Sequence, residues 1–163
     1  TRERIMTQEV FVTSLEKAKT SLNIADHLTY VTFPFLKENK LLLKILEELH
    51  FSLLSIINAI LQYEYANKRI PLYNEPNRNL RVFAEKCAPR YNIRPEEAAR
   101  IIEVLEIWSK HKKSAIEFAR KDNLVIMADN FKTDILSIEK IRGYLTLAKS
   151  ILQKASNCIS HHQ

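Results

Sequence analysis

Glycine is almost absent from this chain: Gly143 is the single glycine among 163 residues. Tight hairpin turns with positive φ use glycine more than any other residue, so a fold rich in hairpins is disfavoured. Glycine-rich loops that cradle the phosphates of a bound nucleotide are excluded for the same reason. Because α-helices need little glycine outside their C-terminal caps, the composition favours a helical protein.

Cysteine motifs and long apolar runs are absent as well. Cys87 and Cys158 lie far apart and form no Cys-x-x-Cys pair, so neither a disulfide framework nor a zinc site is indicated. We therefore expect a reducing compartment, the cytoplasm. Residues 1–10 lack the apolar run of a signal peptide. The most apolar stretch, residues 51–61, is well short of the ~18 residues that a membrane span needs, and we expect no membrane contact.

Length and composition are those of an ordinary globular protein. The chain is 46% hydrophobic and 27% charged, and 163 residues suffice to bury a core without disulfides or metals. We find no internal repeat and no linker. The sequence therefore predicts a single domain over residues 1–163, with residues 1–6 and 160–163 disordered.

Apolar residues recur every three or four positions along most of the chain, which predicts amphipathic helices. Pro34 should end the first helix, because proline lacks a backbone donor. Residues 51–61 are apolar on all sides, as expected for the central helix of a core. In the fourth helix, Ala115 and Phe118 should face inward. The predicted helices cover residues 7–30, 37–68, 79–88, 95–120 and 138–159.

The helical period is lost between residues 123 and 136. Residues 124–127 form a short β-prone run, residues 128–130 have the composition of a turn, and residues 133–136 follow. We predict a two-stranded hairpin that packs against the helices, because an isolated hairpin would not persist. The predicted fold class is therefore mainly α: an up-and-down helical bundle of four to five helices with a small β-hairpin before the last helix.

Two features of the predicted helices allow a dimer. Asn58 stands among isoleucines and is expected to be buried, where it either satisfies a neighbouring backbone or marks a dimer register or ligand contact. The last helix carries an apolar seam with spacings of four and three, which serves either the core or a homodimer interface. The seam consists of Ile141, Leu145, Ala148, Leu152, Ala155 and Ile159.

Positive charge is concentrated in two stretches of a chain whose net charge is +6. Residues 68–94 contain seven basic and two acidic residues, and residues 110–121 contain five basic and one acidic. Such segregation indicates an anionic partner, although a solvated helix surface is the alternative. We predict that the two stretches converge on one face and bind RNA, DNA or another polyanion. The predicted binding residues are Arg78, Arg81, Arg90, Arg94, Lys110, Lys112, Lys113, Arg120 and Lys121.

Aromatic residues lie among the arginines of the first stretch. Tyr73, Phe83 and Tyr91 would stack on bases if they were exposed, and Phe83 fits the core equally well. Ion pairs with Glu85, Glu96 and Glu97 are the alternative role for the arginines.

Catalytic and metal-binding signatures are incomplete. Glu47-x-x-His50 is half of the pattern found in carboxylate-bridged di-iron bundles, but no second copy occurs, so His50 fits better at the edge of the core. Asp26 and His27 are helical neighbours and do not face one another. No nucleophile is positioned by sequence next to a base. We predict no metal, no cofactor and no catalytic residue.

Two segments of the chain resemble known proteins. Residues 37–65, which begin Lys-Glu-Asn-Lys, and residues 111–121 with the following LVIMADN resemble small helical proteins of archaea, most of which have no assigned function. The arrangement is similar, more distantly, to the HEPN class of helical bundles (higher eukaryotes and prokaryotes nucleotide-binding), which includes dimeric ribonucleases and toxins.

The resemblance to HEPN proteins implies a helical bundle without that class's catalytic motif. HEPN ribonucleases carry an arginine four to six residues before a histidine. A binding role is therefore expected, with an antitoxin-like dimeric module or a ribonuclease with a non-standard site as alternatives. The histidines that lack the preceding arginine are His27, His50, His111, His161 and His162.

Overall fold

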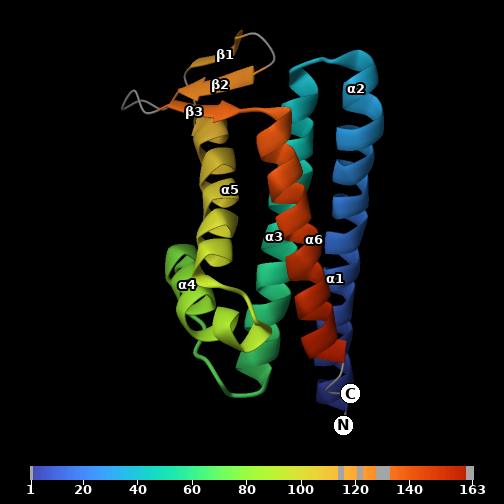
Figure 1. Cartoon of the computed structure of the whole chain (residues 1–163). Helices are drawn as coiled ribbons and strands as arrows, with labels where there is room; N and C mark the ends of the chain where they lie inside the picture. Colours follow the sequence, from blue (N-terminus) through green and yellow to red (C-terminus); the bar gives the residue numbers. More distant parts are fainter. Residues whose placement is uncertain (1, 114–115, 121–122, 128–132, 161–163) are drawn as a thin grey trace.

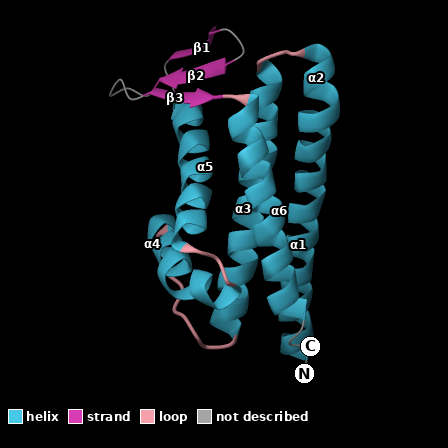
Figure 2. Cartoon of the chain, viewed as in Figure 1, coloured by secondary structure: helices cyan, strands magenta, loops and turns pink. Residues whose placement is uncertain are grey.

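Long helices that run alternately up and down form the molecule (Figure 1). The computed structural model describes residues 2–113, 116–120, 123–127 and 133–160. A small antiparallel sheet lies at one end of the bundle and precedes the last helix (Figure 2). The predicted fold class is thus confirmed. The long helices are α1 (Arg2–His27), α3 (Lys40–Ala66), α5 (Pro95–Lys113) and α6 (Ile138–Ser160).

The central helix is α3, which packs against α1, α5 and α6. All of its isoleucines and most of its leucines are almost completely buried, and each of these contributes about 1.5–3 kcal/mol of transfer free energy. Ser52 donates a hydrogen bond of 2.9 Å to the carbonyl oxygen of Ala18, which fixes the register between α3 and α1. The buried face of α1 consists of apolar residues that recur every three or four positions, as predicted for an amphipathic helix: Phe11, Leu15, Ala18, Leu22 and Ala25. No helix in the described part of the chain is long and apolar enough to cross a membrane.

The apolar seam of α6 belongs to the core. All of its residues are buried except Leu152, which is partly buried, and α6 packs on α3 and α1. Of the two roles predicted for the seam, the structure supports packing in the core. Little of its apolar surface remains exposed for contact with a second copy of the chain.

Asn58 is exposed, so the prediction that it is buried is wrong. It lies seven residues from both Phe51 and Tyr65, which are also exposed, and therefore shares their face of α3. The flanking isoleucines suggested burial, but the 3.6-residue period turns Asn58 to solvent.

Helical structure continues past Pro34, contrary to the prediction. The π-helical turn η1 (Leu28–Thr32) leads into α2 (Phe33–Leu36), where Pro34 occupies a first-turn position that needs no backbone donor. The chain reverses at Lys37, whose φ is 51°. At its other end, α1 begins at Arg2, inside the segment expected to be disordered.

The sheet has one strand more than predicted among the described residues. Strand β2 (Asn123–Met127) pairs with β3 (Thr133–Leu136), which is the predicted hairpin, and β1 (Ile116–Arg120) pairs with the other edge of β2. The prediction that α5 continues to residue 120 is wrong, because β1 exchanges ladder hydrogen bonds with β2 instead. Ala115 and the predicted turn residues 128–130 lie outside the described residues.

An irregular helical segment connects α3 to α5. It begins at Pro76, three residues before the predicted start, and passes from α4 (Pro76–Val82) through the π-turn η2 (Phe83–Cys87) to the 3₁₀ turn η3 (Ala88–Tyr91). Pro89 has no N–H with which to continue an α-helix, which accounts for the change of helical pitch on either side of it. The segment lies against the end of α3, where the candidate site is found.

Candidate functional site

A buried carboxylate, Glu64, lies at the centre of the candidate site. Glu64 is four residues after Ile60 on the buried face of α3 and is only 2% exposed. A buried charge must be paired and hydrogen-bonded. Arg69 donates from Nε to Oε2 (2.6 Å) and from Nη2 to Oε1 (2.9 Å). Arg90 Nη1 donates to Oε2 (3.2 Å), and the Tyr91 hydroxyl donates to Oε1 (3.0 Å).

The turn that ends α3 places Arg69 on Glu64. The amide of Arg69 donates to the carbonyl oxygen of Glu64 (3.0 Å), and the amide of Lys68 donates to that of Tyr65 (2.9 Å). This pair of bonds defines a Schellman motif, in which the residue before the last usually has positive φ. Lys68 occupies that position with a φ of 58°. The helix cap and the ion pair are therefore built from the same residues.

The 3₁₀ turn η3 places Arg90 and Tyr91 on the other side of Glu64. Asn92 follows with a φ of 56°, and the amide of Ile93 donates to the carbonyl oxygen of Ala88 (2.9 Å). This tight reversal presents two consecutive side chains to the same carboxylate.

The protonation states at Glu64 favour binding over proton transfer. Burial opposes ionisation, but the hydrogen bonds from Arg69 and Tyr91 and the charges of Arg69 and Arg90 together outweigh it, so the pKa of the Glu64 carboxyl lies below its ordinary value. Burial raises the pKa of Tyr91, and it raises the pKa of the nearby Cys87 thiol to about 11. Each carboxylate oxygen of Glu64 already accepts two hydrogen bonds, so Glu64 is not a free base, and the raised pKa of Cys87 keeps it a thiol at neutral pH.

A second acid repeats this arrangement one helix further along the chain. Glu97 accepts hydrogen bonds from the amide (3.1 Å) and Nε (3.2 Å) of Arg94 in a capping interaction at the start of α5. Lys154 of α6 donates to Glu97 (3.2 Å) and to the carbonyl oxygen of Asn92 (2.8 Å). Asn92 directly follows η3, which supplies Arg90 and Tyr91 to Glu64. Lys154 therefore connects the surroundings of Glu64 to Glu97, and the two acids belong to one group of residues in contact.

The acids of this group lie beneath its cations. The side chains of Glu64 and Glu97 are 3% and 10% exposed, whereas those of the cations are 25% to 72% exposed. Four positive charges therefore cover two buried negative charges, and solvent meets mainly the cations. We call this group the layered cluster; it consists of Glu64, Arg69, Arg90, Arg94, Glu97 and Lys154.

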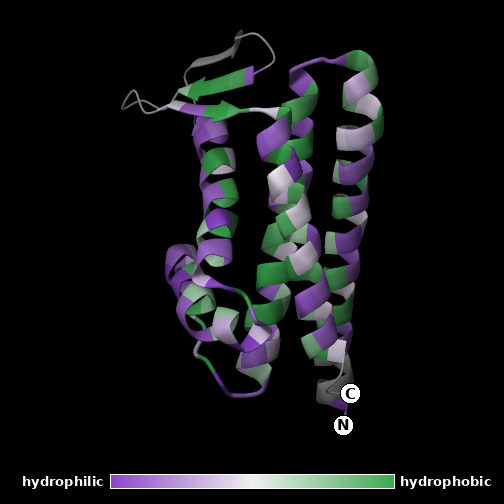
Figure 3. Ribbon diagram, in the orientation of Figure 1, coloured by the Kyte–Doolittle hydropathy of each residue, from purple (hydrophilic) through white to green (hydrophobic). Residues whose placement is uncertain are grey.

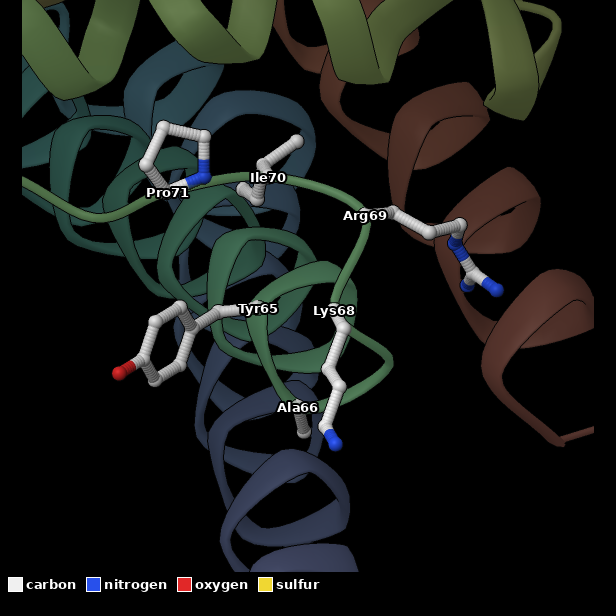
Figure 4. Close-up of a pocket in the computed structure, with 6 residues that line it drawn as sticks. All are labelled: Tyr65, Ala66, Lys68, Arg69, Ile70 and Pro71. Atoms are coloured by element: carbon white, nitrogen blue, oxygen red, sulfur yellow. The ribbon is translucent and has the colours of Figure 1, made fainter.

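Two neighbouring pockets open beside the layered cluster, and Arg69 lines both of them. The first has a volume of about 300 Å³. The second, of about 640 Å³, lies at the end of α3 (Figure 4). The first pocket is lined by Tyr63, Glu64, Arg69, Arg90, Tyr91 and Cys158. The second is lined by Tyr65, Ala66, Lys68, Arg69, Ile70 and Pro71.

Of the predicted binding residues, Arg90 and Arg94 belong to the layered cluster. Arg78 instead stacks on the ring of Tyr73, with the guanidinium carbon 3.7 Å from the ring centroid. Arg81 lines a separate pocket of about 420 Å³ between α4 and α5, together with Glu85 and Glu106.

The second basic stretch lies at the opposite end of α5 (Figure 1). The 19 residues of α5 place its last turn about 28 Å from Arg94, which precedes the helix, whereas Arg81 lines a pocket that reaches Ser109. The convergence of the two stretches on one face stays a prediction. Lys110 is paired with Asp134 (3.0 Å), Lys112 lies 5.0 Å from the ring centroid of Trp108, and Lys113 is exposed. Arg120 lies on β1, and Lys121 lies outside the described residues.

Two of the aromatic residues expected beside the arginines belong to the core. Phe83 is fully buried and Tyr91 is 2% exposed, so neither can stack on a base. Sequence reasoning missed Arg69 and Lys154 as members of the site. The signal for the site was Glu64, a carboxylate that continues the buried face of the most apolar helix.

The remaining candidates have structural roles. His50 is half-buried beside Trp108 (5.6 Å between ring centroids), and burial lowers its pKa. Asp26 pairs with Lys149 of α6. Within the residues that the structure describes, no group of three or more histidine, cysteine or acidic side chains is placed to hold a metal ion.

Comparison with known proteins gives no match to a family model, to a curated protein or to a solved structure. The resemblance to archaeal helical proteins and to HEPN bundles therefore stays a prediction.

Proposed function

We propose that the protein binds a phosphate-bearing polyanion, RNA or DNA, through the layered cluster. The observation that carries this proposal is the burial of Glu64 and Glu97 beneath four more exposed cations. A polyanion that approaches this surface meets the cations first.

The chemistry of the cluster supports an acceptor-rich ligand. Arg90 uses one N–H on Glu64, and Arg69 uses two, so both guanidiniums keep donors for a ligand. Arginine donors match the oxygen atoms of a phosphate group, and Glu64 holds both guanidiniums in place before a ligand arrives. Both cysteines are free thiols, as the cytoplasm would keep them, and we propose that compartment for the activity.

The salt dependence of binding tests the proposal. Affinity for a labelled single-stranded oligonucleotide, measured by fluorescence anisotropy, should fall steeply as salt rises, because each neutralised phosphate releases counterions. Arg94→Gln and Arg90→Gln should each weaken binding and reduce the log–log salt slope by about 0.7. Lys113→Gln, an exposed cation at the other end of α5, serves as the matched control and should leave both quantities nearly unchanged. Absence of binding at low salt would refute the proposal.

A second candidate function, self-association, is favoured by an apolar corner at η1 and α2. Phe35 is 87% exposed there, and hydrophobic residues gather at this turn (Figure 3). Because the α6 seam is buried, this corner is the better surface for a homodimer. Light scattering should then show a dimer that Phe35→Ser converts to a monomer; a wild-type monomer would exclude it. The corner consists of Tyr30, Val31, Phe35 and Leu36.

A further inference from the structure

Tyr65 presents an uncovered aromatic ring at the edge of the candidate site. It is 53% exposed, and no cation or ring stacks on it within the described residues. Tyr73 differs, because the guanidinium of Arg78 covers its ring. The pocket beside Tyr65, at about 640 Å³, falls within the size range of ligand sites, and Ile70 and Pro71 give it apolar walls.

Three kinds of side chain follow one another across the end of α3 (Figure 4). Tyr65 projects on one side, Lys68 lies in the middle, and Arg69 reaches toward α6 on the other side. The Schellman motif fixes this order, because it ties Lys68 to Tyr65 and Arg69 to Glu64. Arg69 also lines the first pocket together with Arg90, so the row of side chains extends to a second guanidinium.

We propose that this end of α3 binds a single-stranded nucleic acid, with an unpaired base stacked on Tyr65 and the phosphate backbone passing Lys68 to Arg69 and Arg90. The inference rests on the proposed polyanion binding and specifies its ligand. Aromatic platforms next to a cationic path are the features with which proteins hold single strands, since every base offers a face for stacking.

Other polyanions satisfy only part of this surface. Bases of a duplex are stacked on one another and cannot reach Tyr65, and inorganic polyphosphate has no base to place there. A mononucleotide would not extend from Tyr65 past Lys68 to the two arginines. The arrangement of aromatic, ammonium and guanidinium groups therefore favours a strand of several nucleotides.

An oligonucleotide without bases separates stacking from phosphate binding. We would compare a labelled single strand of about ten nucleotides, an abasic strand of equal length and a duplex of the same sequence. The full-length chain should bind the single strand most tightly. Tyr65→Ala should weaken that binding about tenfold and leave the abasic strand unaffected. Tyr65→Phe should restore it, and Tyr73→Ala, the matched control, should change it little.

The outcomes distinguish this inference from the broader proposal. If the abasic strand binds as tightly as the normal one, or if Tyr65→Ala has no effect while Arg90→Gln weakens both, the stacking site is refuted and polyanion binding stands. If neither strand binds at low salt, both are refuted. Circular dichroism of Tyr65→Ala, with this side chain on the surface, should show an unchanged helical fold, so that a loss of affinity reports on the site.

Discussion

The two ends of α5 carry similar amounts of positive charge and arrange it differently. At the end of α5 that lies near the C-terminal end of α3, Glu64 and Glu97 are buried under cations. At the end near the sheet, Lys110 is 35% exposed and its partner Asp134 is 21% exposed, so both the acid and the base are partly exposed to solvent. Lys112 lies over Trp108 rather than over an acid. Two segments with comparable composition thus present different surfaces to an anion.

This difference shows that the burial of the paired carboxylates decides how much positive charge a basic segment exposes to an anion. A carboxylate at the surface screens its partner and repels an approaching phosphate, whereas a buried one orients its partner and is hidden from the ligand. The same difference in depth should appear in stability, because exposed ion pairs contribute little and buried charges that lose a partner are costly.

The largest difference between the two ends is expected in the free energy of unfolding, when the charge of one acid is removed at each end. Glu64→Gln should destabilise the fold by about 2 kcal/mol, since two guanidiniums lose a buried counterion and the new amide N–H₂ faces donors. Asp134→Asn at the sheet end should cost less than about 1 kcal/mol. Urea denaturation of both variants measures the contrast.

Acid titration provides the control for this prediction. The folded-state pKa of Glu64 lies below its ordinary value of 4.5, so its contribution is present above pH 4.5 and is lost as the pH falls through the folded-state pKa. Glu64→Gln should flatten this acid limb of the stability profile. Equal losses for Glu64→Gln and Asp134→Asn at pH 7 would show that burial does not distinguish the two ends.

A smaller effect is expected at two lysines with positive φ, one at each end of α3. Lys68→Gly and Lys37→Gly should each stabilise the fold by about 0.5–1 kcal/mol, because glycine adopts these conformations without steric cost. Thermal unfolding measures the gain. Only Lys68→Gly should weaken oligonucleotide binding, since Lys37 lies at the other end of the bundle. A loss of affinity in both variants would contradict the assignment of the site.

The smallest effect concerns His50, near the sheet end of α5. Burial lowers its folded-state pKa below 6.5, so the unfolded chain binds a proton more readily and stability should decrease as the pH falls below 6.5. His50→Gln should remove this decrease, which urea titrations between pH 7 and pH 5 would detect. Lys112→Met should reduce it, because the charge of Lys112 contributes to the lowered pKa. An unchanged profile in His50→Gln would assign the decrease to another group.

Much of the fold follows from local patterns. The inner face of α1, the start of α5 at Pro95 and the seam of α6 are all visible as apolar spacings or capping residues, and each is found as expected. Strand β1 is not predicted from the sequence, because Ile116 and Phe118 are equally compatible with a longer α5. Only the pairing with β2 identifies the strand. Asn58 shows that burial is set by position around the helix axis and not by sequence neighbours.

The site was harder to predict than the fold, because it depends on contacts between distant segments. Arg90 and Arg94 were identified by charge alone. Lys154 stands 57 residues after Glu97 and is one of four basic residues spread along α6, and only the packing of α6 brings it to the acid. The local composition of α6 therefore does not single out Lys154 among the basic residues of the helix.

The Schellman motif at the end of α3 makes one structural unit of the helix terminus and the binding surface. A ligand that holds Lys68 and Arg69 also keeps the last turn of α3 from opening, since the amides of these residues close that turn. Hydrogen–deuterium exchange at these two backbone amides should consequently slow when the site is occupied. The terminal turn would thus act as an intrinsic, label-free reporter of ligand binding.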